Sequence, residues 1–146
     1  MKRKTELRVA LFLATITIAT VSWLCITHES NKPSLDDFYH AVAQVESNGD
    51  DLAVGNHAEL GRYQITYDFW VDSMEYADIG GTFDSCRLPE YSKMIMQGYY
   101  RRYANKAWHE QNFYDLARIH HGGWNGRNRI HTIKYAERVV ALMGAE

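Results

Sequence analysis

Residues 35–49 have the sequence LDDFYHAVAQVESNG, and this stretch decides the fold class. Its apolar side chains recur at spacings of three and four, which places them on one face of a helix: Leu35, Phe38, Val42 and Val45. Ser34 is suited to cap this helix, with acidic residues in the first turn. The turn residues at 47–49 predict its end.

Helix patterns also dominate the chain beyond this stretch. We expect further helices near residues 66–76, 89–108, 113–119 and 133–142. Residues 50–62 contain turn-forming residues and predict a loop or a small hairpin. Residues 120–126 (HHGGWNG) hold three glycines in five positions, which predicts a tight loop rather than regular structure. The predicted fold is mainly α, of the α+β type, with one minor β or irregular lobe.

The N-terminal part has a different composition. Residues 9–26 carry no charge over 18 positions, and as a helix they would span about 27 Å, close to the thickness of a bilayer core. Basic residues precede this run, which places the N-terminus in the cytoplasm. We therefore expect a tip and single-pass anchor at 1–28 and a domain at 29–146 that faces the periplasm or the cell exterior. A cleaved signal peptide with secretion is the alternative.

Charge and cysteine content exclude several classes. The net charge is −2, from 16 Lys+Arg and 18 Asp+Glu, so no basic excess indicates a nucleic-acid partner. Two cysteines are too few for a disulfide scaffold, and Cys86 is expected to be a buried small hydrophobe. No zinc-binding or serine-hydrolase motif is present. We expect no metal, no cofactor and a monomer.

Glu46 stands out because of its place in the first helix. It lies on the last turn, where the helix dipole disfavours a carboxylate, and Val42 and Val45 are its neighbours. Both effects raise the pKa of a carboxyl group. A carboxylic acid that stays protonated near neutral pH is suited to general-acid catalysis. A surface glutamate that points into water is the alternative interpretation.

Four segments then carry a resemblance. AQVESNG (43–49), AVG (53–55) and GRYQI (61–65) look like the opening of soluble lytic transglycosylases and goose-type lysozymes. YDLARIHHGGWNG (114–126) resembles a segment of invertebrate-type lysozymes. In this order and spacing, over about residues 38–142, they resemble the lysozyme-like muramidases.

The resemblance implies an enzyme that cleaves the β-1,4 bond between N-acetylmuramic acid and N-acetylglucosamine in peptidoglycan, with Glu46 as the acid. It also implies a set of substrate-binding residues: Ser47, Tyr63, Gln64, His120, Gly122, Gly123, Asn125 and Tyr135. Core packing is the alternative for Tyr63 and Tyr135, and a tight interhelical turn is the alternative for the glycines. A weakly apolar anchor that leaves the bilayer, as in some phage endolysins, is a further hypothesis.

The second carboxylate departs from the family pattern. Invertebrate-type lysozymes place an Asp just ahead of Val-Gly, where this chain has Ala53. Asp51 is our choice for that role, while Glu59 lies later, near the glycine turn. Without a second carboxylate, Glu46 would serve as acid and then as base in forming a 1,6-anhydro product. A non-catalytic wall-binding or membrane-assembly module that retains the cleft is the second functional hypothesis.

Overall fold

Helix α2 (Leu35–Ser47) begins and ends where the sequence predicts. In this computed structural model, which describes residues 32–144, the Ser34 hydroxyl accepts a hydrogen bond from the Asp37 N–H at 3.2 Å. The Asp37 carboxylate accepts one from the Ser34 N–H at 2.6 Å. This reciprocal pair satisfies two backbone donors that a helix start otherwise leaves free. Asn48 ends the helix in the left-handed conformation, with φ at 57°.

Six α-helices and two 3-10 helices make up the described part of the chain. After α2 they are α3 (Tyr67–Ala77), η1 (Phe83–Arg87), α4 (Pro89–Tyr103), α5 (Asn105–His109), α6 (Phe113–Gly122), η2 (Gly123–Asn128) and α7 (Thr132–Met143). Between α2 and α3, the only pairing among residues 32–144 consists of two isolated antiparallel bridges, Val54 with Leu60 and Leu60 with Ile65. The prediction of a mainly helical domain with a minor irregular lobe is confirmed.

Two boundaries differ from the prediction. The helix expected over 89–108 breaks at Ala104, which turns the chain so that Ala104 and Ala107 are both buried. The loop expected at 120–126 is helical: α6 continues through Gly122, and η2 follows directly. Glycine explains the second difference, because a Cβ on Gly126 would overlap the Arg118 carbonyl oxygen. The glycines there let η2 lie against α6.

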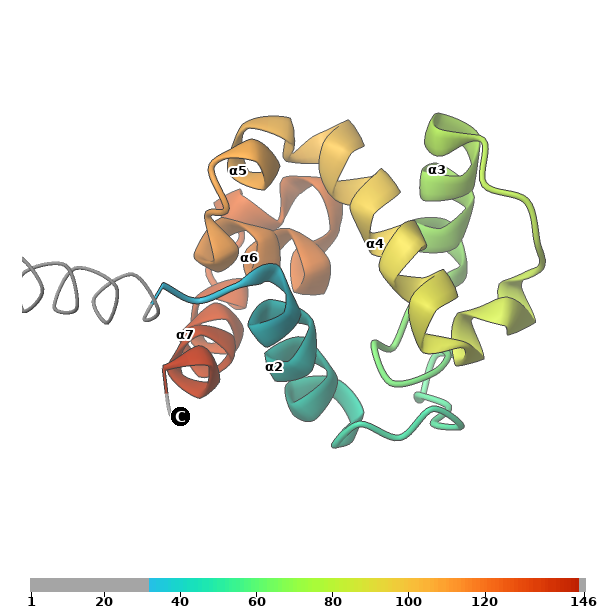
Figure 1. Cartoon of the computed structure of the whole chain (residues 1–146), viewed down its shortest axis with the longest axis horizontal. Coiled ribbons are helices and arrows are strands. Elements are labelled where there is room, and N and C mark those ends of the chain that lie inside the picture. The colour runs from blue at the N-terminus through green and yellow to red at the C-terminus, as the bar shows by residue number, and fades with distance from the viewer. Residues whose placement is uncertain (1–31, 145–146) are drawn as a thin grey trace, which may run out of the picture. The chain divides into compact units, whose positions relative to one another are not determined.

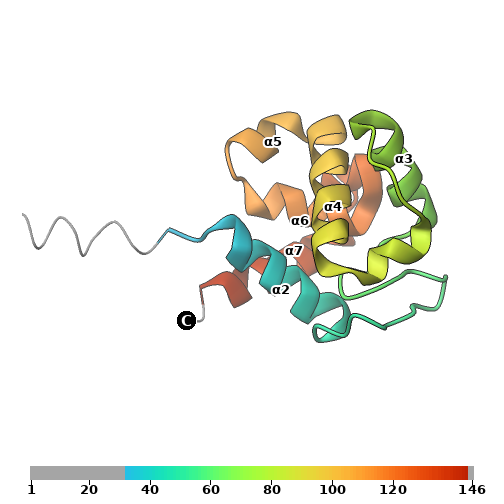
Figure 2. The same cartoon turned by 45° about the vertical axis from the view of Figure 1, so that its right-hand side comes forward.

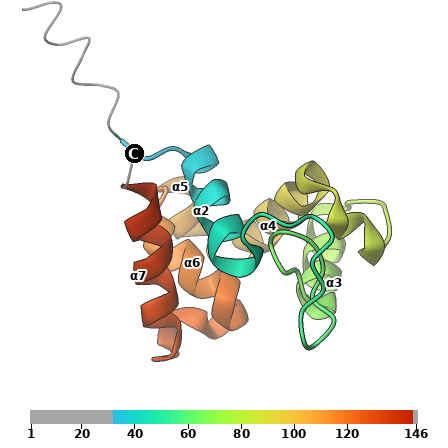
Figure 3. The ribbon, with the colours of Figure 1, turned by 90° about the horizontal axis from the view of Figure 1, so that it is seen from below.

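Helix α4 occupies the middle of the domain. Figures 1 and 3 show it between α3 on one side and the group of α2, α6 and α7 on the other. It packs against α3, η1, α5 and α6, while α7 packs against both α2 and α6. In Figure 2 the long connection from α2 to α3 passes below the start of α4. This connection, residues 48–66, is the irregular lobe, and its position beside α2 forms the site described below.

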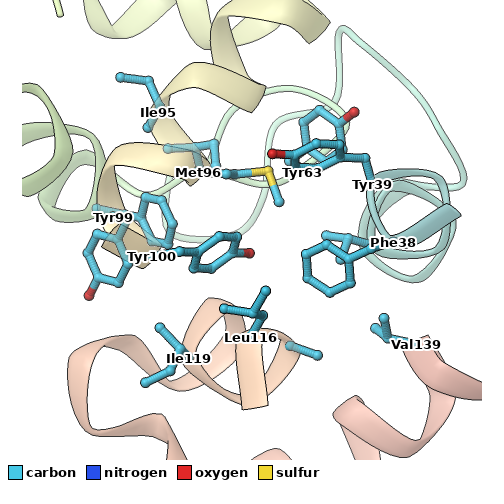
Figure 4. Packing of buried hydrophobic residues seen from close by; sticks show 14 of the residues in the cluster. Phe38, Tyr39, Tyr63, Ile95, Met96, Tyr99, Tyr100, Leu116, Ile119 and Val139 are labelled. Carbon is cyan, nitrogen blue, oxygen red and sulfur yellow. The ribbon is translucent and has the colours of Figure 1, made fainter. Parts of the chain in front are cut away.

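The core joins α2, α4 and α6. Phe38, Met96 and Leu116 are fully buried and converge from these three helices in Figure 4. Phe38 stacks on Phe113 with ring centroids 5.3 Å apart. Cys86 is 1% exposed, as predicted, and burial raises the pKa of its thiol to about 12. Nine aromatic side chains of residues 32–144 are buried in this core.

The predicted anchor at residues 9–26 lies outside the described residues. None of the helices within residues 32–144 has the length and the apolar composition needed to cross a bilayer.

The contact between α3 and α4 depends on Gly98. A Cβ there would overlap the Ser73 hydroxyl oxygen, which donates a hydrogen bond to the Ile95 carbonyl. We expect Gly98→Ala to lower the free energy of unfolding by about 1–3 kcal/mol in urea titrations, although alanine has a higher helix propensity than glycine. Gly80→Ala is the control, because a Cβ at Gly80 meets nothing within 4 Å. Equal stability of the two variants would contradict this account of the contact.

Candidate active site

A pocket of about 350 Å³ opens at the C-terminal end of α2. The end of α2, the irregular lobe and the end of α6 supply its walls. Its lining consists of Glu46, Gly55, Asn56, His57, Glu59, Gln64, Thr66, His120 and His121. The end of α6, which is distant in the sequence, therefore meets the end of α2 and the lobe that follows it, and all three bring polar side chains to one place.

Glu46 is held in a largely buried position at one wall of this pocket. Its side chain is only 18% exposed. Burial is the largest influence on its carboxyl group and raises the pKa, and the nearby Glu59 carboxylate acts in the same direction. The Tyr135 hydroxyl, His121 when it is protonated and the positive charge of Arg138 oppose this shift but do not cancel it. The carboxyl group therefore holds its proton to a higher pH than an exposed glutamate does.

His120 is the second polar group at this wall, and it is neutral. Its side chain is 3% exposed, and burial lowers the pKa of the ring to about 4. The ring Nε2 lies 3.0 Å from the Tyr63 carbonyl oxygen, which can only accept, so Nε2 carries the proton. The Nδ1 atom then accepts from the Tyr100 hydroxyl at 3.1 Å. Although Nε2 lies 3.6 Å from Glu46 Oε1, the ring provides no cation to favour the carboxylate.

Hydrogen bonds hold the irregular lobe against α2. The Ser47 hydroxyl donates to the Arg62 carbonyl oxygen at 2.9 Å. The Arg62 guanidinium donates to both carboxylate oxygens of Asp51, at 2.5 and 2.9 Å. Gln64 has a left-handed backbone (φ 48°), and its Nε2 donates to the Gly61 carbonyl oxygen at 2.8 Å. These contacts fix the side of the lobe that faces Glu46.

A second pocket, of about 640 Å³, continues from the first. Both pockets are lined by Gln64, Thr66, His120 and His121. The second extends along the start of α3 to the end of α6 and the start of η2, where Gly122, Gly123 and Trp124 line it. Trp124 is 63% exposed and Tyr67 is 58% exposed, so two aromatic side chains border the opening. The two pockets share four lining residues and together form one groove.

A family model described as Destabilase matches residues 36–141, which include nearly all of α2 through α7 and both pockets. The chain belongs to the Destabilase family. This family is lysozyme-like, of the invertebrate type, in a superfamily of glycosidases and isopeptidases. The lysozyme-like resemblance seen in the sequence is thereby confirmed at the level of the superfamily. No curated protein matches the chain.

The Destabilase domain brings five of the predicted site residues to the groove. Glu46 lines the first pocket, and Gln64 and His120 line both. Gly122 and Gly123 line the second. Gly123 has φ at 71°, a conformation that favours glycine, and this allows its backbone to border the groove at the start of η2.

Three predicted residues, two in the irregular lobe and one at the end of α2, lie elsewhere. Asp51 lines neither pocket, because its carboxylate is paired with Arg62, which also lowers its pKa. Tyr63 is 2% exposed and packs in the core against Tyr39, so it offers no face to a sugar. Ser47 holds the lobe through its bond to Arg62 and lines neither pocket. Core packing, the alternative named for Tyr63, is what the structure contains.

Two more predicted residues lie near the groove but do not line it. The Asn125 side-chain oxygen accepts a hydrogen bond from Asn128 within η2, so it is not directed to a ligand. Tyr135 is 7% exposed and stacks on His121, with ring centroids 4.4 Å apart. Its hydroxyl has no hydrogen bond of ordinary geometry among the described residues, although it approaches Glu46. Tyr135 thus supports the wall behind Glu46 and does not close the far side of the cleft.

The sequence predicted no role for several lining residues: His57, Thr66, Tyr67, Trp124 and Glu59, which was noted near the glycine turn but passed over for Asp51. For Glu59 a signal existed, since the glycine-rich segment 55–61 predicts a turn. The pairing of Val54 with Leu60 folds that turn back beside Glu46, and no local pattern specifies this direction.

The burial of Glu46 has a consequence for stability. A carboxyl group whose pKa is raised by folding stabilises the fold below its unfolded pKa, and this contribution is lost as pH rises through the folded pKa. We expect Glu46→Gln to unfold at a higher temperature than the parent at pH 7 and to lose this advantage near pH 4. Thermal unfolding over this pH range measures the difference. Lower stability of the variant at pH 7 would contradict the burial argument.

Proposed function

We propose that this Destabilase-family domain cleaves the β-1,4 bond between N-acetylmuramic acid and N-acetylglucosamine in peptidoglycan, with Glu46 as the general acid. The observation that carries the proposal is the buried carboxyl group of Glu46 at a groove, beside a histidine that is neutral and offers it no ion pair. Such a carboxyl group holds its proton to a higher pH than an exposed glutamate does and can donate it to a leaving oxygen.

The chemistry begins with the bound glycan strand in the groove. The Glu46 carboxylic acid donates its proton to the glycosidic oxygen as the bond to the muramic C1 breaks and the sugar ring gains oxocarbenium character. The exposed faces of Trp124 and Tyr67 offer stacking surfaces for neighbouring sugar rings. The two adjoining pockets offer room for sugar units on either side of the residues they share.

Isopeptide cleavage, the other activity class of the superfamily, has less support. Hydrolysis of an amide by nucleophilic catalysis commonly uses a serine or cysteine activated by a base. Neither residue type lines the two pockets. Cys86 is buried, and a thiol with a pKa of about 12 is not a thiolate at neutral pH. We therefore favour the glycosidase chemistry.

The predicted anchor fits this function. An N-terminal segment in the membrane with its N-terminus in the cytoplasm would hold the domain on the side where peptidoglycan lies. We propose glycan strands as the partner and the periplasm or cell exterior as the location.

Turbidity and reducing-end assays on purified cell walls test the proposal with the full-length chain. We expect Glu46→Gln to lose about 100-fold or more of the activity, because a general acid contributes about that much. Glu137→Gln, an exposed glutamate on α7, is the matched control and should keep the parental rate. Equal rates for Glu46→Gln and the parent would refute Glu46 as the acid. An inactive parent that still binds walls would favour the non-catalytic module.

A further inference from the structure

A second carboxylate, Glu59, lines the pocket with Glu46. It belongs to the irregular lobe, so a different segment of the chain supplies each of the two carboxyl groups. Its side chain is 19% exposed, about as much as that of Glu46. The two groups are close enough that the charge of Glu59 raises the pKa of Glu46.

The surroundings of Glu59 favour the ionised form. Partial burial raises its pKa, but hydrogen bonds from its own backbone N–H and from His57 outweigh this and lower the pKa overall. The His57 backbone N–H donates to Glu59 Oε2 at 2.9 Å, and His57 Nδ1 lies 3.4 Å from Oε1. One pocket thus contains a carboxyl group whose pKa is raised and another whose pKa is lowered, which is the arrangement of an acid and a base.

Gly55 lets two side-chain oxygens of the pocket approach its backbone closely. A Cβ on Gly55 would overlap Glu59 Oε2 and would lie 2.6 Å from Gln64 Oε1. Both oxygens therefore lie close to each other over the glycine backbone, at positions that a β-carbon would exclude. The Gln64 amide is oriented by the bond from its Nε2 to the Gly61 carbonyl oxygen, so its Oε1 is the atom that lies beside Glu59.

We propose that Glu59 is the general base of the reaction, and that it activates a water molecule held between its own carboxylate and the Gln64 carbonyl oxygen. A water that donates one hydrogen to each of two acceptors keeps a lone pair free for attack. This inference rests on the proposed function and assigns the second carboxylate to Glu59 in place of Asp51, which is paired with Arg62.

The step balances as a hydrolysis. The water oxygen forms a bond to the muramic C1, and the bond from C1 to the glycosidic oxygen breaks. Glu59 takes one proton from the water, and Glu46 gives its proton to the leaving oxygen. The products are a reducing N-acetylmuramic acid end and a free 4-hydroxyl on N-acetylglucosamine. Attack from the face opposite the leaving group gives the α-anomer from the β-linked substrate.

Three variants of the full-length chain test this role on purified peptidoglycan. We expect Glu59→Gln to lose about 100-fold or more in kcat. The backbone conformation at Gly55 is compatible with alanine, but the methyl group of Gly55→Ala would displace the Glu59 and Gln64 oxygens, and we expect this variant to lose at least tenfold in the same assay. Glu137→Gln is again the control at the parental rate. Far-UV circular dichroism and thermal unfolding confirm that each variant is folded.

Azide separates a catalytic role from a structural one. Azide attacks C1 without needing a base, so we expect it to restore turnover to Glu59→Ala with formation of an α-glycosyl azide, and not to restore Glu46→Gln. Loss of activity in a folded Glu59→Ala that azide does not restore would overturn the base assignment.

The outcomes for Glu59 and for the muramidase proposal are distinct. If Glu46→Gln is inactive while Glu59→Gln keeps the parental rate, the base assignment fails and the general acid stands. If the parent releases 1,6-anhydromuramic ends, the muramic 6-hydroxyl replaces water, and Glu59 is not the base although the same bond is cleaved. If the parent cleaves no glycan at all, the proposed function itself fails.

Discussion

Glu46 lies where α2 ends and is largely buried. A buried carboxylate needs a cationic partner, and the neutral His120 beside Glu46 is not one. The nearest imidazole, His120, is fixed as the neutral Nε2–H form by the Tyr63 carbonyl and the Tyr100 hydroxyl. Those two bonds come from the irregular lobe and from α4, so the neutral environment of Glu46 depends on how three parts of the domain pack together. The reactivity proposed for Glu46 follows from this packing.

The same packing explains why the site faces a groove. Ser47 fastens the lobe to the end of α2, and the pairing of Asp51 with Arg62 stiffens the lobe from the other side. These residues are close to Glu46 in the sequence but hold the lobe in place and do not contact a ligand. The lobe in turn presents Gln64 and Glu59 to the pocket. Residues with structural roles and residues with chemical roles thus alternate along one short segment.

Local patterns in the sequence predicted the features that neighbouring residues determine. The spacing of apolar residues and the Ser34 cap gave α2 with its bounds, and helix polarity singled out Glu46. The directions of side chains in the irregular lobe could not be predicted, because non-local contacts determine them: Tyr63 turns into the core and Asp51 turns to Arg62. The three glycines at residues 120–126 led to the wrong prediction of a loop. They instead allow η2 to pack closely against α6.

The most direct test of this account is an NMR titration that follows the side-chain carboxyl carbon of Glu46 and the ring nitrogens of His120. The account predicts that Glu46 titrates above the ordinary glutamate value of 4.5, and that His120 stays the neutral Nε2–H tautomer until the pH falls to about 4. A Glu46 carboxyl that ionises at or below its ordinary value, next to a His120 that is cationic near neutral pH, would contradict it.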